Sequence, residues 1–167
     1  MFGQLSIDTA KFAREATELS GTFSPAQMPR VAAQLFDLNG NIRYAVRGYV
    51  TGRGGPAITL KITGSVNLRC ERCLERLQYD LLLERDLVLL NGIDEFEPRD
   101  DEDDLVDIIP ATPQLDLHAT LEEEVMLGLP MAPRHEEGEC HVPGEVASAS
   151  DGERQPTAFA VLAKLKQ

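Results

Sequence analysis

Three cysteines and one histidine are the residues whose types and spacing most clearly indicate chemistry. Cys70 and Cys73 are separated by two residues in "VNLRCERCLERLQYDL", and Cys140 follows His135 by five positions in "LPMAPRHEEGEC". Two cysteines at this spacing can turn both sulfurs toward one point when they lie in a tight turn. Thiolates and imidazole suit tetrahedral Zn²⁺, and a closed structural site needs four ligands. The four residues are therefore a candidate zinc site.

Three other interpretations of these thiols stay open on the sequence. A thioredoxin-type redox pair needs its cysteines at the N-terminus of a helix, whereas the residues after Cys73 show no helical stripe. Alternatively, Cys70 packs inward as a small apolar side chain and Cys73 is incidental. The third interpretation is a catalytic pair of Cys73 and His135, although no nucleophile motif accompanies it. Each interpretation predicts different surroundings for the four side chains.

Strands must position the cysteine pair. The run "AITLKITGSVNLRC" carries apolar side chains at alternate positions, and "LQYDLLLERDLVLL" (77–90) reads as a second long strand. The polar residues "ERCLER" (71–76) between them are typical of a turn. Earlier in the chain, "NGN" (39–41) contains residues that tolerate positive φ, so it predicts a hairpin turn with a strand on either side. The pattern indicates an antiparallel meander of at least four strands.

Helices are predicted before and after these strands. Apolar residues recur at helical spacing in "DTAKFAREATEL" (8–19). They recur again in "PQLDLHATLEEEVMLGLP" (113–130), with Asp116 as the N-cap and Glu122–Glu124 facing solvent. A short strand, "LVDIIP" (105–110), precedes this long helix. We therefore expect an α+β fold, with an antiparallel β meander or barrel-like sheet, an N-terminal helix, and a long helix after the last strand.

The chain is predicted to form one domain followed by a tail. The α+β domain is predicted over residues 1–137. Within it, a run of acidic residues at about 94–104 predicts a solvent-exposed loop. Residues 138–156 are small, polar and rich in Pro and Gly, so they predict a flexible linker. The apolar segment "TAFAVLAKLKQ" makes 157–167 a predicted C-terminal docking segment.

The net charge of −12 is unevenly distributed. Residues 29–90 carry nine Lys/Arg and six Asp/Glu, a net of +3, whereas residues 91–154 carry three and nineteen, a net of −16. Phosphates respond to the local field within a Debye length of about 8–10 Å, so the first half can contact RNA while the acidic half faces protein or solvent. The candidate RNA-binding residues are Arg43, Arg47, Arg53, Lys61, Arg69, Arg72 and Arg76.

Other features narrow the class of protein. An odd number of cysteines does not make a disulfide framework, and no apolar run approaches the roughly 20 residues of a membrane span. The first residues lack the basic start and unbroken apolar stretch of a signal peptide. We expect a cytoplasmic, non-enzymatic protein with no membrane contact and no small-molecule substrate, for which zinc is the one candidate cofactor.

Several stretches, taken in order, resemble the YceD family, whose members are called large ribosomal RNA subunit accumulation proteins. They are "CERCLERLQYDL", the acidic run, "LEEEVMLGLPMAPRHEEGEC" and "FAVLAKLK". The likeness extends from about residue 30 to the C-terminus. By position, Cys70 and Cys73 match the family's paired cysteines, and His135 and Cys140 match its "P-x-H-x4-C" segment.

The resemblance implies a bacterial or plastid cytoplasmic factor needed for synthesis, processing or stability of large-subunit (23S) rRNA, with no established enzymatic activity. The expected partners are large-subunit rRNA or a pre-ribosomal particle, a basic ribosomal protein, or both. An alternative is a protein-interaction adaptor whose acidic segment, 95–107, binds a basic ribosomal protein without RNA contact. A thiol enzyme is a third alternative.

Overall fold

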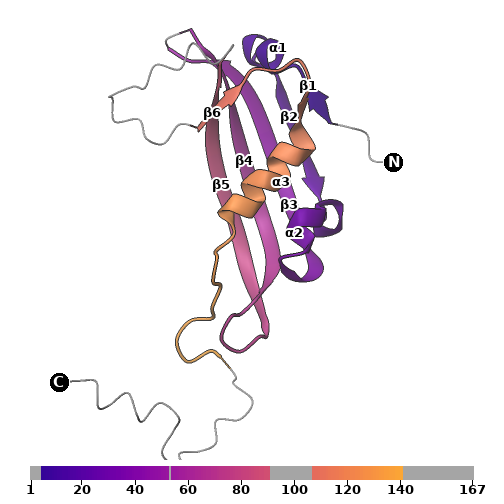
Figure 1. Cartoon of the computed structure of the whole chain (residues 1–167), viewed down its shortest axis with the longest axis vertical. Coiled ribbons are helices and arrows are strands. Elements are labelled where there is room, and N and C mark those ends of the chain that lie inside the picture. The colour runs from indigo at the N-terminus through magenta and orange to yellow at the C-terminus, as the bar shows by residue number, and fades with distance from the viewer. Residues whose placement is uncertain (1–4, 53, 91–106, 141–167) are drawn as a thin grey trace, which may run out of the picture.

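The computed structural model of the protein describes residues 5–52, 54–90 and 107–140. These residues form an α+β fold in which α3 and α2 lie over one face of a large sheet (Figure 1). The elements in chain order are β1 (Ser6–Ile7), α1 (Thr9–Arg14), β2 (Glu18–Phe23), the 3₁₀ helix η1 (Pro25–Gln27), α2 (Pro29–Ala32), β3 (Leu35–Val50), β4 (Pro56–Arg69), β5 (Arg76–Leu90), β6 (Asp107–Pro110), β7 (Leu115–Asp116) and α3 (Leu117–Gly128).

The large sheet has the strand order β2-β3-β4-β5-β6. Strands β2 to β5 pair antiparallel with their neighbours in sequence, which confirms the predicted meander. Strand β6 adds to the edge in parallel with β5, so Leu87 stands opposite Asp107. The first and last strands do not pair, so the described sheet is open and does not close into a barrel. A separate two-stranded sheet joins β1 to β7.

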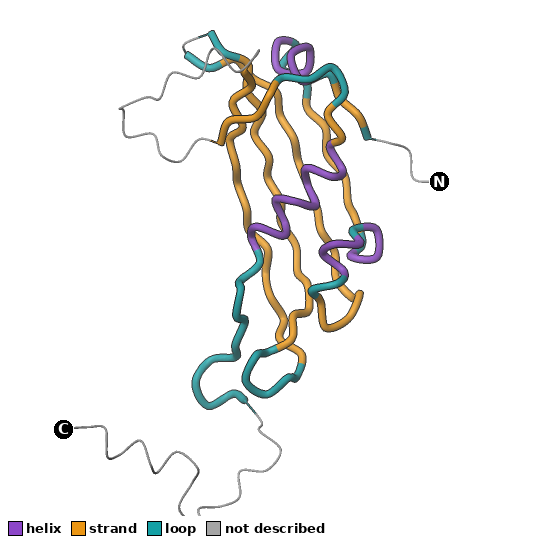
Figure 2. Tube along the Cα trace, in the orientation of Figure 1, coloured by secondary structure: helices purple, strands orange, loops and turns teal. Residues whose placement is uncertain are grey.

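Helix α3 lies diagonally across the large sheet (Figure 2). Its Leu117, Leu121 and Val125 are fully buried and belong to the same apolar cluster as side chains of β3, β4 and β5. Asp116 is the N-cap, as predicted, because its carboxylate accepts a hydrogen bond from the Ala119 N–H at 3.1 Å. Each fully buried Leu or Val contributes about 1.5–3 kcal/mol, so this face anchors the helix.

The prediction that Glu122–Glu124 face solvent is wrong for two of the three residues. Glu122 and Glu124 are buried, at 6% and 8% exposure. The Glu122 carboxylate accepts hydrogen bonds from the Arg30 N–H at 2.6 Å and the Val31 N–H at 3.4 Å. Glu122 therefore caps the first turn of α2 and ties that helix to α3, which a helical spacing pattern cannot reveal.

The helix predicted over 8–19 is shorter than expected. Helix α1 ends at Arg14, and Ala16 takes a positive φ of 48° where the chain reverses. The following residues form β2, whose side chains alternate between exposed and half-buried positions. An apolar residue at position 19 fits both a helical stripe and an alternating strand, and pairing with β3 decides in favour of the strand.

The hairpin turn predicted at 39–41 is also wrong, because β3 continues through it. Between Leu35 and Gly40 the register against β4 shifts, so five steps along β3 match two steps along β4. The Asp37 carboxylate accepts hydrogen bonds from the Asn39 N–H and the Asn67 side-chain amide, each at 2.8 Å. The turn-forming residues here produce a bulge in β3. The neighbouring strand β4, which is distant in the sequence, stabilises this bulge through Asn67.

Some predictions fall on residues that the structure does not describe. The acidic loop (94–104), the docking segment (157–167) and the predicted linker from residue 141 onward lie outside the described residues. Among the helices that are described, none is long and apolar enough to cross a membrane.

At the end of the sheet away from α1, the turn between β4 and β5 lies beside the loop that follows α3 (Figures 1 and 2).

Candidate metal centre

The turn between β4 and β5 presents the two cysteines of the pair on one side. The Cys70 N–H donates to the Glu75 carbonyl at 3.0 Å, and the Leu74 N–H donates to the Cys70 carbonyl at 2.9 Å. These bonds close a knuckle over 70–75. Leu74 reaches a positive φ of 63°, the conformation in which such a turn usually favours glycine. The predicted turn at 71–76 is thereby confirmed.

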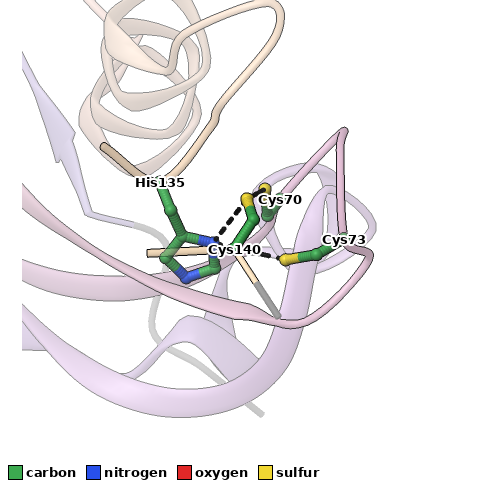
Figure 3. Close-up of side chains that lie close together, drawn as sticks. All are labelled: Cys70, Cys73, His135 and Cys140. Carbon is green, nitrogen blue, oxygen red and sulfur yellow. Dashed lines mark hydrogen bonds between the residues drawn. The ribbon is translucent and has the colours of Figure 1, made fainter. Parts of the chain in front are cut away.

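The loop after α3 supplies the other two side chains. The Glu71 N–H donates to the Pro133 carbonyl at 2.8 Å, which fastens the start of this loop to the knuckle. Gly138 has a φ of 91° and allows a tight turn within the loop. This turn brings Cys140 back toward His135, so both side chains face the knuckle (Figure 3).

The four side chains converge on one point. Their ligand atoms, three Sγ and one imidazole nitrogen, all lie within 4.8 Å of one another. The Cys70 and Cys140 Sγ atoms are 3.6 Å apart. The His135 Nδ1 lies 3.4 Å from the Cys73 Sγ and 3.7 Å from the Cys140 Sγ. In a tetrahedral zinc site two sulfurs lie about 3.8 Å apart and a sulfur and a nitrogen about 3.5 Å apart, so the donor set fits Zn²⁺.

The imidazole of His135 is oriented by its other nitrogen. Its Nε2 lies 3.0 Å from the Arg76 carbonyl oxygen, which can only accept a hydrogen bond. Nε2 therefore carries a proton. The side chains of Cys140 and Cys70 raise the pKa of the imidazole, so Nδ1, which faces the sulfurs, would give up its proton to a bound metal. A backbone carbonyl that accepts from the other ring nitrogen is one of the usual ways in which a protein orients a metal-binding histidine.

The two cysteines of the knuckle differ in acidity. Burial raises the pKa of the Cys70 thiol, but backbone hydrogen bonds around it, led by that from Cys73, outweigh burial and lower the pKa to about 5. Burial raises the pKa of the Cys73 thiol, and the nearby Cys70 and Cys140 raise it further. A thiolate disfavours a second negative charge beside it, and a shared divalent cation would remove that conflict.

The structure brings together all four residues that the sequence grouped as one site. Cys70 and Cys73 are buried, whereas His135 and Cys140 are half-buried. The pair lies in a turn between two strands and not at a helix N-terminus, so the feature that activates a thioredoxin-type thiol is missing at this turn. The cluster could supply four protein ligands, which is the composition of a structural zinc site.

The six described candidates for RNA binding do not form one free cationic surface. Arg47 pairs with Glu18 at 3.3 Å, and Lys61 pairs with Glu84 at 2.8 Å. Arg53 lies outside the described residues. The guanidinium of Arg72 is directed at the candidate metal centre, where its Nε lies 2.9 Å from the Cys140 Sγ. Neither composition nor periodicity signals that role, because the contact joins residues far apart in sequence.

The remaining three cations are differently placed. Arg43 lines a depression of about 370 Å³ on the sheet, together with Asn41 and Thr63. The guanidinium of Arg69 lies 5.9 Å from the ring centroid of Phe36. Arg76 stands opposite Arg69 in the pairing of β4 with β5. Among the described residues these three cations have no ion pair, so they are the ones left available for a polyanion.

The comparisons with known proteins agree on one family. A family model described as "Large ribosomal RNA subunit accumulation protein YceD" matches residues 58–166, more than half of the chain and all four candidate ligands. A protein of that name from Haemophilus influenzae is 27% identical over 175 residues, covering 98% of this chain and 95% of the relative. No solved structure matches the chain. The chain therefore belongs to the YceD family.

Proposed function

We propose that the protein is a non-enzymatic factor that supports the accumulation of large-subunit rRNA through its synthesis, processing or stability. The proposal rests on membership of a family named for that role and on a relative of the same name that aligns with nearly the whole chain. The composition of the cluster supports a structural role for any metal bound there, because four protein ligands would leave no open coordination position for a substrate.

The convergence of two distant loops is the observation that carries the structural part of this proposal. Bound zinc would make two bonds to the knuckle (70–75) and two to the loop that ends at Cys140. The knuckle joins β4 to β5, so the ion would fix the position of Cys140 relative to the sheet. The chain's own contacts, such as that from Glu71 to Pro133, hold the two loops in register for binding.

A genetic replacement tests the function. A Haemophilus influenzae strain that lacks its own relative is expected to recover its ratio of large- to small-subunit rRNA when this chain is expressed. Cys140→Ser should restore the ratio less well, at equal protein level, because it removes one ligand. The ratio is read by electrophoresis of total RNA, and subunit profiles on sucrose gradients give a second readout. No recovery by the folded, expressed wild-type chain would count against the function itself.

Direct RNA contact is proposed for Arg43, Arg69 and Arg76, the described candidates whose side chains neither form an ion pair nor contact the candidate metal centre. The double variant Arg69→Ala/Arg76→Ala should weaken binding to large-subunit rRNA fragments and reduce the slope of log K against log salt by about 1 per lost phosphate contact. Arg47→Ala/Lys61→Ala removes the same charge from cations that are already paired, so it is the matched control. Equal effects of the two double variants would argue for non-specific electrostatics.

The charge distribution favours a second candidate function, that of a protein-interaction adaptor. Residues 91–154 carry a net charge of −16, and the segment 95–107 holds a dense part of it. Such a segment is suited to a basic ribosomal protein. Association with pre-ribosomal particles that survives nuclease treatment, and is lost when residues 95–104 are neutralised, would favour the adaptor over direct RNA contact.

A further inference from the structure

We propose that Arg72 holds the two loops of the metal centre together and offsets the negative charge of its ligands. In this role Arg72 sets how tightly the site holds its ion, and it does not contact RNA. The inference rests on the zinc-binding role proposed above for the four ligands. Arg72 is one of the candidate RNA-binding cations, but its side chain points toward the four ligands.

Arg72 contacts both the knuckle and the loop after α3. Its backbone N–H, in the knuckle, donates to the Cys70 Sγ at 3.4 Å. Its side chain crosses to the other loop, where Nε donates to the Cys140 Sγ at 2.9 Å. Nη2 of the same guanidinium lies 3.1 Å from the His135 carbonyl oxygen and 3.2 Å from that of Glu136. One residue thus contacts sulfurs from both loops and two carbonyls of the loop that carries half of the ligands.

The geometry of these contacts requires a guanidinium. Nε and Nη2 lie in one plane and donate at the same time to a sulfur and to two carbonyl oxygens. A lysine ammonium has a single nitrogen on a flexible stem, so it cannot reproduce this fork. Cys140 is half-buried, whereas Cys70 is fully buried. The guanidinium therefore lies against the more accessible of the two sulfurs that Arg72 contacts.

The charge of the loaded site also calls for a cation. Three thiolates and one neutral imidazole around Zn²⁺ have a net charge of about −1. The loop around the site adds Glu136, Glu137 and Glu139, with Arg134 as a cation on the same segment. A positive charge in direct contact with a ligand sulfur offsets this excess, because electrostatic interactions are stronger at a partly dry site than in water. Arg72 is the cation that the structure places there.

A zinc-competition experiment on the full chain tests the inference. Zinc affinity is measured against a chromophoric chelator for the wild type, Arg72→Gln, Arg72→Lys and Arg69→Gln. We expect Arg72→Gln to lose about 10- to 100-fold in affinity, the usual range for residues that support metal ligands. Arg72→Lys should fall in between, since it restores the charge but not the fork. Arg69→Gln removes the same charge three residues away, beside Phe36, and should change affinity less than about twofold.

Two further measurements separate a role at the metal from a general loss of structure. The absorption of the Co²⁺-substituted protein should keep the bands of a tetrahedral S₃N site in Arg72→Gln, because all four ligands remain. Alkylation of Cys140 in the zinc-loaded protein should become faster in Arg72→Gln than in Arg69→Gln, because the guanidinium no longer covers that sulfur.

The outcomes are distinguishable. Equal zinc affinities and equal alkylation rates for Arg72→Gln and Arg69→Gln, in a chain that binds one zinc, would overturn the inference and leave the metal site intact. A wild-type chain that binds no zinc would overturn both the inference and the metal role proposed for the cluster. Loss of rRNA-fragment binding in Arg72→Gln with zinc affinity unchanged would return Arg72 to the RNA-binding set.

Discussion

Two regions of the molecule, the sheet with α3 and the knuckle with the loop after α3, are held together by different forces. The sheet and α3 share an apolar cluster of buried side chains from several helices and strands. Leu60 and Ile62 of β4 and Leu121 of α3 are among them. The knuckle and the loop after α3 instead meet through four candidate ligands and a few hydrogen bonds. Apolar burial is distributed and tolerant, whereas a metal site depends on each ligand. We therefore expect the knuckle and the loop after α3 to lose their order more readily than the sheet does.

Removing one buried side chain from the core should have the largest effect. Leu121→Ala is expected to lower the free energy of unfolding by about 2–5 kcal/mol, because Leu121 is fully buried under the sheet. Urea unfolding followed by circular dichroism measures the loss. Leu82→Ala, the same change at a side chain that is 84% exposed, should cost less than about 0.5 kcal/mol. Similar losses for the two variants would contradict the assignment of the core.

The buried cap on α2 should have the next largest effect. Glu122→Ala leaves the N–H groups of Arg30 and Val31 without their acceptor, so we expect a loss of about 1–3 kcal/mol in unfolding free energy. Glu123→Ala on the exposed side of the same helix turn is the control and should be nearly neutral. Faster amide exchange confined to 29–32 in Glu122→Ala would support the cap, and an unchanged exchange pattern would not.

Relieving strain in the knuckle should raise stability. Leu74→Gly is expected to stabilise the protein by up to about 1 kcal/mol, because Leu74 has a φ of 63° and glycine adopts that conformation without a steric penalty. The side chain is 62% exposed, so little burial is lost. Thermal unfolding of Leu74→Gly and of Leu82→Gly gives the comparison. The second variant should destabilise, since glycine weakens an ordinary strand.

Metal removal should have the smallest effect on overall stability of the changes considered. It should leave the sheet folded and loosen the loop after α3. After chelation we expect the far-ultraviolet circular dichroism and a cooperative unfolding transition to persist, because none of the four candidate ligands belongs to the apolar cluster that the sheet shares with α3. Amide exchange over 133–140 should rise, while exchange in β3 and β4 stays slow. A sheet that unfolds on chelation would show that the two regions form one cooperative unit.

Local patterns predicted much of the framework. The long strands that became β4 and β5, the turn between them and the Asp116 cap of α3 all follow from alternation, turn chemistry and helical spacing. The grouping of the four candidate ligands was also predictable, because the chain contains few cysteines and histidines. These features depend on neighbours within a few positions or on residue type alone.

Other features depended on contacts between distant residues. An apolar position at 19 fits a helix or a strand, and only the pairing of β2 with β3 decides. The residues at 39–41 suit a turn, but the hydrogen bond between Asp37 and Asn67 keeps them in β3 as a bulge. The burial of Glu122 depends on where α2 lies. In each case a partner outside the local window supplies the deciding energy.

The sequence by itself determined which residues can ligate a metal and which stretches become the main strands and the long helix, because these follow from side-chain chemistry and hydrophobic period. Only the tertiary structure decided that the knuckle and the loop after α3 meet, and that Arg72 faces the sulfurs while Arg69 does not. The physical reason is that charge and hydrogen-bonding capacity belong to a residue, whereas the partner of a cation is set by how strands and loops are brought together in space.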